Sequence, residues 1–135
     1  MNSQLTLALD HVAIQTTNLD QALAFYVDGL GGNLTSRAPF KTREQAWVVL
    51  GGVKLEIYTV RQGEELLPWK DEYRGPVHLA FSVENLEAFL AEVARKGIFL
   101  HPSHPTPFRP PVPNPPLIAY LHGPDGEEVE IREEW

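Results

Sequence analysis

The sequence predicts an α+β protein made of two similar halves, each with a strand, a helix and then further strands. Two observations predict this fold class: an internal repeat, and the pattern of apolar residues within each half. The segment from His11 to Ala24 aligns without gaps on the segment from His78 to Ala91. A second aligned pair, 52–57 and 126–131, shares the pattern Gly-x-x-x-Glu-Ile. Each half therefore opens with a histidine and closes with a glutamate.

The length and composition limit the class of protein. A chain of 135 residues buries enough surface for a single domain, expected over 1–135, with module one at about 5–60 and module two at about 75–133. The absence of cysteine excludes disulfides and thiolate metal sites. A net charge of -7 with eleven Lys plus Arg disfavours nucleic acid. No apolar run indicates a membrane span or a signal peptide, so we expect a cytoplasmic protein.

Module one is predicted to begin with a strand over Leu5–Gln15, because alternate residues share one face. That face carries Leu5, Leu7, Leu9, His11, Ala13 and Gln15, and the other carries Val12 and Ile14. Asn18 is a suitable N-cap for an amphipathic helix that ends at Gly31-Gly32. Two further strands, Glu44–Leu50 and Val53–Thr59, are predicted to join through a Gly-Gly hairpin turn.

Module two repeats this order. Pro76–Val83 is predicted to be a strand, and Asn85 the N-cap of a helix that ends at Gly97. The strands Leu117–His122 and Glu127–Arg132 are predicted to join through the turn Gly-Pro-Asp-Gly.

A proline-rich segment distinguishes the second module from the first. Eight of the twelve prolines lie between Pro102 and Pro116, which excludes an interior helix or a central strand there. We expect an extended loop with polyproline character. This loop either closes over a cleft through Phe108 and Arg109 or is a surface loop with no role in function.

Two histidines and two glutamates in matching positions are the candidate metal ligands: His11, Glu56, His78 and Glu130. Both glutamates lie on the polar faces of their strands, opposite the residues that would pack on helices. Two imidazoles and two carboxylates suit a divalent ion, because the carboxylates neutralise its charge and an octahedron keeps two positions open. One such residue alone is more often solvated or structural. Recurrence in both halves favours a metal site.

Several motifs resemble one known family. They are the openings Asp10-His11-Val12-Ala13-Ile14 and His78-Leu79-Ala80-Phe81-Ser82-Val83, Phe25-Tyr26 followed by Gly-Leu-Gly-Gly, and the closing Gly-Pro-Asp-Gly-Glu-Glu-Val-Glu-Ile. With a paired βαβββ plan over essentially the whole chain, they resemble the vicinal oxygen chelate superfamily of glyoxalases, bleomycin resistance proteins and extradiol dioxygenases. The closing motif is the most specific, although Gly123 replaces the first Asp of the family's Asp-Pro-Asp-Gly-x-x-x-Glu.

The resemblance implies a U-shaped mixed sheet around a cleft, and a homodimer. It also implies that the cleft binds a divalent ion (Zn, Ni, Co or Mn) through His11, Glu56, His78 and Glu130. The substrate would be a small molecule whose neighbouring oxygens chelate this metal. Glu130 or Glu56 would take a carbon-bound proton as general base, as in a glyoxalase I-like lyase or isomerase.

Gln15 departs from the glutathione-dependent bacterial members, which typically have an arginine four residues after the first histidine. The sequence therefore disfavours glutathione as the substrate. Three alternatives stay open. An extradiol-type dioxygenase would bind iron through His11, His78 and Glu130, against which Glu56 argues. A metal-free drug-binding protein of the bleomycin-resistance type would not need these ligands, and their presence argues against it. A structural or regulatory protein could keep the four residues without binding a metal.

Other polar residues are predicted to be solvated or structural rather than functional. Lys54 and Arg109 could supply positive charge to the cleft but fit solvated surface better. His101, His104 and His122 lie near the proline-rich loop or the closing turn, and we interpret them as surface or structural residues.

Overall fold

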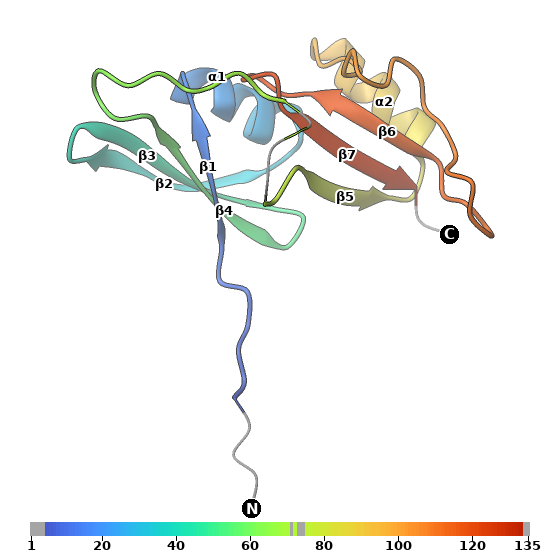
Figure 1. Cartoon of the computed structure of the whole chain (residues 1–135), viewed down its shortest axis with the longest axis horizontal. Coiled ribbons are helices and arrows are strands. Elements are labelled where there is room, and N and C mark those ends of the chain that lie inside the picture. The colour runs from blue at the N-terminus through green and yellow to red at the C-terminus, as the bar shows by residue number, and fades with distance from the viewer. Residues whose placement is uncertain (1–4, 71, 73–74, 134–135) are drawn as a thin grey trace, which may run out of the picture.

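The computed structural model describes residues 5–70, 72 and 75–133, and it contains two mixed sheets with few helices (Figure 1). Module one contains β1 (Val12–Thr16), α1 (Leu19–Leu23), the π-helix η1 (Ala24–Gly29), β2 (Asn33–Phe40), β3 (Arg43–Leu50) and β4 (Val53–Thr59). Module two contains β5 (Leu79–Val83), α2 (Leu86–Arg95), β6 (Ile118–His122) and β7 (Glu128–Glu133). The predicted fold class is confirmed.

The two sheets follow the same plan. The first has the order β1-β4-β3-β2, and the second has the order β5-β7-β6. In each sheet the opening strand pairs in parallel with the closing strand, while the remaining pairs are antiparallel. The second sheet has one strand fewer, because Leu100 makes only an isolated bridge to Leu121. The strands β1 and β5 lie at sheet edges.

The helix caps follow the predicted signals. Asn18 accepts the amide hydrogen of Gln21 at 3.0 Å, and Asn85 accepts that of Ala88 at 3.0 Å. The first helix changes to π geometry after Leu23, where Leu30 N–H donates to Phe25 O at 2.9 Å, five residues back. The second helix stops at Gly97, whose φ of 82° favours glycine.

The opening strand is shorter than predicted. We expected a strand over Leu5–Gln15, but β1 begins at Val12, and residues 5–11 form an extended arm away from the body (Figure 1). The physical reason is the parallel register, in which Val12 pairs with Leu55. Since β4 begins at Val53, only two residues earlier, the chain before Asp10 has no strand beside it.

Two further differences concern strands. The strand predicted from Pro76 begins at Leu79. The strand β2 was not predicted from the sequence, and all of its residues are exposed. As predicted, Pro102–Pro116 forms neither a helix nor a strand and makes one isolated bridge, between Phe108 and Ile118, but turns and bends interrupt the loop, so it is not extended throughout.

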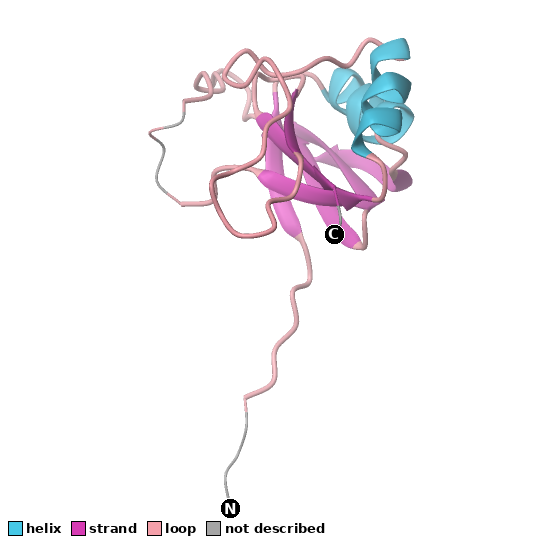
Figure 2. Ribbon diagram, turned by 90° about the vertical axis from the view of Figure 1, so that its right-hand side faces the viewer, coloured by secondary structure: helices cyan, strands magenta, loops and turns pink. Residues whose placement is uncertain are grey.

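The core lies between the helices and one face of the sheets. Figure 2 shows the helices gathered on one side of the strands. The fully buried side chains include Leu19, Tyr26, Leu55, Ile57, Leu86, Val93, Leu121 and Ile131. The opposite faces of β4 and β7 are therefore available for polar side chains. Among the described residues, no helix is long and apolar enough to cross a membrane.

Candidate metal centre

The first candidate pair is His11 with Glu56. His11 directly precedes β1, and Glu56 lies in the adjacent strand β4, where it pairs with Ala13. The imidazole Nε2 lies 3.9 Å from Glu56 Oε1, and Nδ1 lies 2.7 Å from Asp10 Oδ2. The side chains of His11 and Glu56 are 35% and 21% exposed, so a ligand can reach both.

Two residues of β3 hold this first pair in place. Gln45 donates a hydrogen bond from Nε2 to Glu56 Oε2. Trp47, directly across from Glu56 in the antiparallel register, packs edge-on against the His11 ring at a centroid distance of 4.9 Å. The imidazole and the carboxylate are thus oriented toward each other by their neighbours.

The second pair, His78 with Glu130, repeats this geometry in module two. His78 precedes β5, and its Nε2 lies 3.3 Å from Glu130 Oε1. The Tyr120 hydroxyl donates to the same carboxylate oxygen at 2.8 Å, while Arg132 Nε lies 3.3 Å from Oε2. Glu130 is only 10% exposed. This carboxylate is therefore more enclosed and has more partners than Glu56.

Each half-site thus consists of a histidine, a glutamate and a cross-strand aromatic residue. Tyr120 lies opposite Glu130 in the β6–β7 register and packs edge-on against His78 at 5.3 Å, as Trp47 does against His11. Trp47, Tyr120 and Gln45 were not among the site residues predicted from the sequence. Trp47 and Tyr120 could be identified by their positions directly across from a candidate ligand on the neighbouring strand, but this requires that the strand register be known.

The spacing within each pair fits two ligands of one ion. Two donor atoms at about 2.1 Å from a metal and at right angles to each other are roughly 3 Å apart. The observed 3.3 Å and 3.9 Å require only small side-chain movements to reach that value. The donor chemistry and the orientation of both pairs therefore suit a divalent cation.

The two pairs do not meet within one chain. Among the described residues, no group of three or more His, Cys, Asp or Glu side chains is close enough to hold a metal ion. The structure thus brings each predicted histidine to its predicted glutamate and leaves the two half-sites apart.

Burial and nearby carboxylates raise the pKa of two tyrosines, Tyr120 on β6 and Tyr26 in η1. Burial raises the pKa of Tyr120 above its ordinary value, and its hydrogen bond to Glu130 raises the pKa further. The pKa of Tyr26 is raised by burial first and then by the charge of Glu127. Both hydroxyls therefore keep their protons at neutral pH and act as donors.

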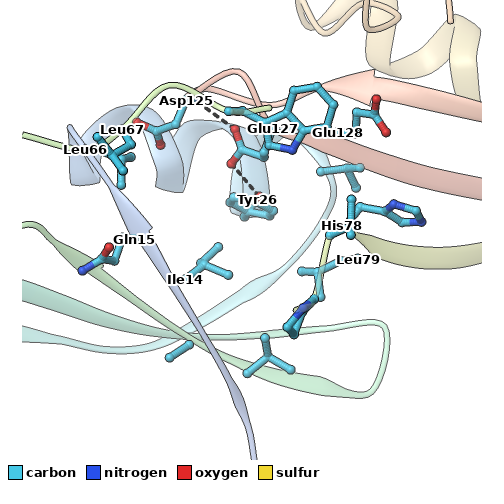
Figure 3. Close-up of a pocket in the computed structure, with 16 residues that line it drawn as sticks. Ile14, Gln15, Tyr26, Leu66, Leu67, His78, Leu79, Asp125, Glu127 and Glu128 are labelled. Atoms are coloured by element: carbon cyan, nitrogen blue, oxygen red, sulfur yellow. Dashed lines mark hydrogen bonds between the residues drawn. The ribbon is translucent and has the colours of Figure 1, made fainter. Parts of the chain in front are cut away.

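A cavity of about 310 Å³ lies between the two modules (Figure 3). Its walls come from β1, Tyr26, the segments 66–69 and 76–79, and the closing turn. His78 and Gln15 are among the lining residues. Within it, Glu127 accepts hydrogen bonds from the Tyr26 hydroxyl at 3.0 Å and from the Asp125 amide at 2.8 Å. Burial raises the pKa of Glu127.

The remaining candidates lie in ordinary structural contacts. Lys54 Nζ lies 3.4 Å from Asp10 Oδ1, near the first pair. Arg109 donates to the carbonyl of Pro115 at 2.9 Å, inside its own loop. Phe108 and Ile118 exchange two backbone hydrogen bonds of 2.9 Å, which attach this loop to the edge of β6.

The chain is thus a small α+β protein of two modules with the same topology, each opening with a histidine and closing with a glutamate. The family model described as Glyoxalase/Bleomycin resistance protein/Dioxygenase superfamily matches residues 8–131, and the chain belongs to this family. No curated protein sequence matches the chain.

Several solved structures share this fold. A glyoxalase family protein from Enterococcus faecalis is 27% identical, with a TM-score of 0.78 over 93% of this chain and 97% of that one. A glutamate-to-glutamine mutant of the fosfomycin resistance protein FosX from Listeria monocytogenes, in complex with Mn(II), is 16% identical, with a TM-score of 0.71 over 97% and 93%. TnmS3, an antibiotic binding protein from Streptomyces, is 16% identical, with a TM-score of 0.69 over 98% and 100%.

Proposed function

We propose that the protein is a divalent-metal-dependent lyase or isomerase acting on a small substrate with neighbouring oxygens. The observation that carries this proposal is the repeated His–Glu pair, with nitrogen and carboxylate oxygen facing each other at 3.3 Å and 3.9 Å. Membership of the family, and the Mn(II) complex of FosX, support a metal at this place. The ligand set suits zinc, nickel, cobalt or manganese.

We further propose that the complete site joins two copies of the chain. One copy would supply His11 and Glu56, and a second copy would supply His78 and Glu130. Twofold symmetry then creates two equal sites, so the dimer would bind one metal per chain. This arrangement explains why the two half-sites are separate in a single chain.

The metal would act as a Lewis acid that withdraws electrons from the two substrate oxygens. The proposed roles of the protein are to orient the substrate and to move protons. Among the described residues, Gln45 alone donates a hydrogen bond to Glu56, which is the more exposed of the two carboxylates, so Glu56 is the more mobile proton acceptor. Glu130 is held on both oxygens by Tyr120 and Arg132 and would remain fixed.

The substrate class follows from what lies beside the ligands. Gln15 lines the cavity and provides no positive charge for a glutathione carboxylate. Four protein ligands leave two metal positions, which suffice for a chelating substrate but not for that substrate together with oxygen. The proposed chemistry is therefore proton transfer or elimination beside a carbonyl, without glutathione and without oxygen uptake.

A metal-free binding protein is the second candidate. The cavity of about 310 Å³, largely lined by apolar residues such as Val12, Ile14 and Leu79, supports it, as does the fold shared with the antibiotic binding protein TnmS3. This candidate does not explain why both His–Glu pairs have their own orienting aromatic residue and hydrogen-bond donor.

Metal content decides between the two candidates. Protein purified without chelator and reconstituted with zinc, nickel, cobalt or manganese should contain about one ion per chain by elemental analysis. Substoichiometric metal after every reconstitution would refute the enzyme proposal and favour the binding protein.

A further inference from the structure

A chain of hydrogen bonds runs from Glu128 through Ser103 to His104, beside the second half-site. Ser103 Oγ lies 2.7 Å from Glu128 Oε1 and 3.0 Å from His104 Nδ1. A hydroxyl has a single proton, and both the Glu128 carboxylate and the lone pair of His101 Nδ1 can only accept it, so Ser103 donates to one of these two and not to His104. Ser103 must then accept from His104, which places the imidazole proton on Nδ1 and leaves the lone pair on Nε2.

His101 fixes the other side of this network. Its Nε2 donates to the carbonyl of Gly126 at 2.8 Å. Its Nδ1 lies 2.8 Å from Ser103 Oγ and 3.1 Å from the Ser103 amide nitrogen. The His101 side chain is buried, so it holds the turn that carries Ser103 and His104 against the closing turn of module two.

Stacking fixes the plane of the His104 ring next to the second half-site. The ring stacks on Tyr120 at a centroid distance of 4.5 Å and an angle of 29°, and on Phe108 at 5.2 Å and 21°. The hydroxyl of the same Tyr120 donates to Glu130. Within the described part of the chain, His104 Nε2 makes no hydrogen bond, and the side chain is partly exposed.

We infer that His104 is a proton-transfer residue of the site, which takes a carbon-bound proton of the substrate on Nε2. This inference rests on the proposed lyase or isomerase function. In the step, the C–H bond breaks, the proton moves to Nε2, and the electron pair of the bond moves into the adjacent carbonyl. The Ser103 oxygen and the Glu128 carboxylate stabilise the resulting imidazolium, as the acid does in a catalytic triad.

Return of the proton to the neighbouring carbon or oxygen completes an isomerisation and restores the neutral ring. The site then contains two kinds of proton acceptor, a carboxylate and an imidazole. Two acceptors at different places allow a proton to leave one position and arrive at another, which is what an isomerase with two bases requires.

The tautomer of His104 can be tested without metal or substrate. Nitrogen-15 NMR of the metal-free protein, with the signals assigned by their loss in His104→Gln, should show a proton on Nδ1 and none on Nε2. Ser103→Ala should shift the tautomer toward Nε2–H, whereas Ser82→Ala, a serine on β5, should leave it unchanged. A wild-type His104 protonated on Nε2 would overturn the inference.

The catalytic role can be tested with dihydroxyacetone, a small ketone with adjacent hydroxyls, in deuterated water. We expect zinc-loaded protein to exchange its carbon-bound hydrogens, and His104→Gln to slow this exchange at least tenfold while keeping its zinc, since general acid–base groups contribute about 10²–10⁴-fold. Ser82→Ala is the control and should keep the wild-type rate. Equal rates for His104→Gln and wild type, or zinc binding by wild type without exchange, would overturn the role of His104. Failure to bind zinc would instead refute the proposed function and leave the tautomer result standing.

Discussion

Mixing two variants that each lack one carboxylate tests where the metal ligands meet. Glu56→Gln removes the charged oxygen from the first half-site, and Glu130→Gln removes it from the second. The amide can still accept the hydrogen bond from Gln45 or Tyr120, so we expect both variants to fold. An amide is a poorer ligand for a divalent ion than a carboxylate. Loss of a residue that only hydrogen-bonds to a ligand already lowers metal affinity about 10–100-fold, so loss of a ligand should lower it at least as much. Each variant should therefore bind zinc at least about a hundredfold more weakly.

A mixture of the two variants should regain a calculable fraction of the wild-type zinc sites. In a dimer that contains one chain of each variant, one site combines both substitutions and the other has four native ligands. Random exchange of equal amounts makes about half of the dimers mixed, so about a quarter of the wild-type zinc sites should return. The variants are unfolded together, refolded, washed with a weak chelator, and measured by elemental analysis and light scattering.

Glu128→Gln is the matched control, because this acid lies on the same strand and face as Glu130 but bonds Ser103 instead. It should keep its zinc. No recovery in a mixture that contains dimers would show that the ligands do not meet between chains. Equal zinc loss in all three glutamine variants would mean that the acidity of the strands, rather than the paired geometry, attracts the ion.

Two further predictions concern single hydrogen-bonded groups. Tyr120→Phe removes the donor to Glu130 Oε1 and should weaken zinc binding about 10–100-fold in a chelator competition, whereas unchanged affinity would exclude an orienting role. Burial raises the pKa of Glu127, so this carboxyl binds a proton more tightly in the folded protein than in the unfolded chain. Its contribution to the free energy of unfolding is therefore fully present below its ordinary pKa and is lost as the pH rises through the raised pKa. Glu127→Gln cannot ionise, so in thermal unfolding its melting temperature should rise relative to wild type between pH 4 and pH 8, and a difference independent of pH would contradict this reasoning.

The features that the sequence predicted correctly are those with local causes. Asn18 and Asn85 cap the helices because a short polar side chain precedes an apolar stripe, and Gly97 ends the second helix because it adopts a positive φ. The polar face of β4, on which Glu56 lies opposite the buried Leu55 and Ile57, was predicted from the alternation of side chains along that strand. Side-chain alternation and caps depend on neighbours in sequence, so one chain suffices to find them.

The features that the sequence did not reveal depend on partners far along the chain. Trp47 and Tyr120 matter because the register places them across from Glu56 and Glu130, and nothing local fixes that register. The opening strand was overpredicted because its leucines alternate as a strand requires, while β4 is too short to pair with them. His104 looked like a surface residue because Ser103, Glu128 and Tyr120 come together only in the folded protein.

The arm before β1 supports the proposed second copy independently of the metal ligands. Leu5, Leu7 and Leu9 are 97%, 88% and 73% exposed and lie on alternate positions of an extended segment. Covering such side chains contributes roughly 1.5–3 kcal/mol each, so a surface that buries them gains appreciable free energy. The strands β1 and β5 both end their sheets, and both line the cavity between the modules. Edge strands left open in this way favour pairing with another chain. A second copy that covers these edges would bury the leucines and, by the same contact, bring each half-site to its missing counterpart.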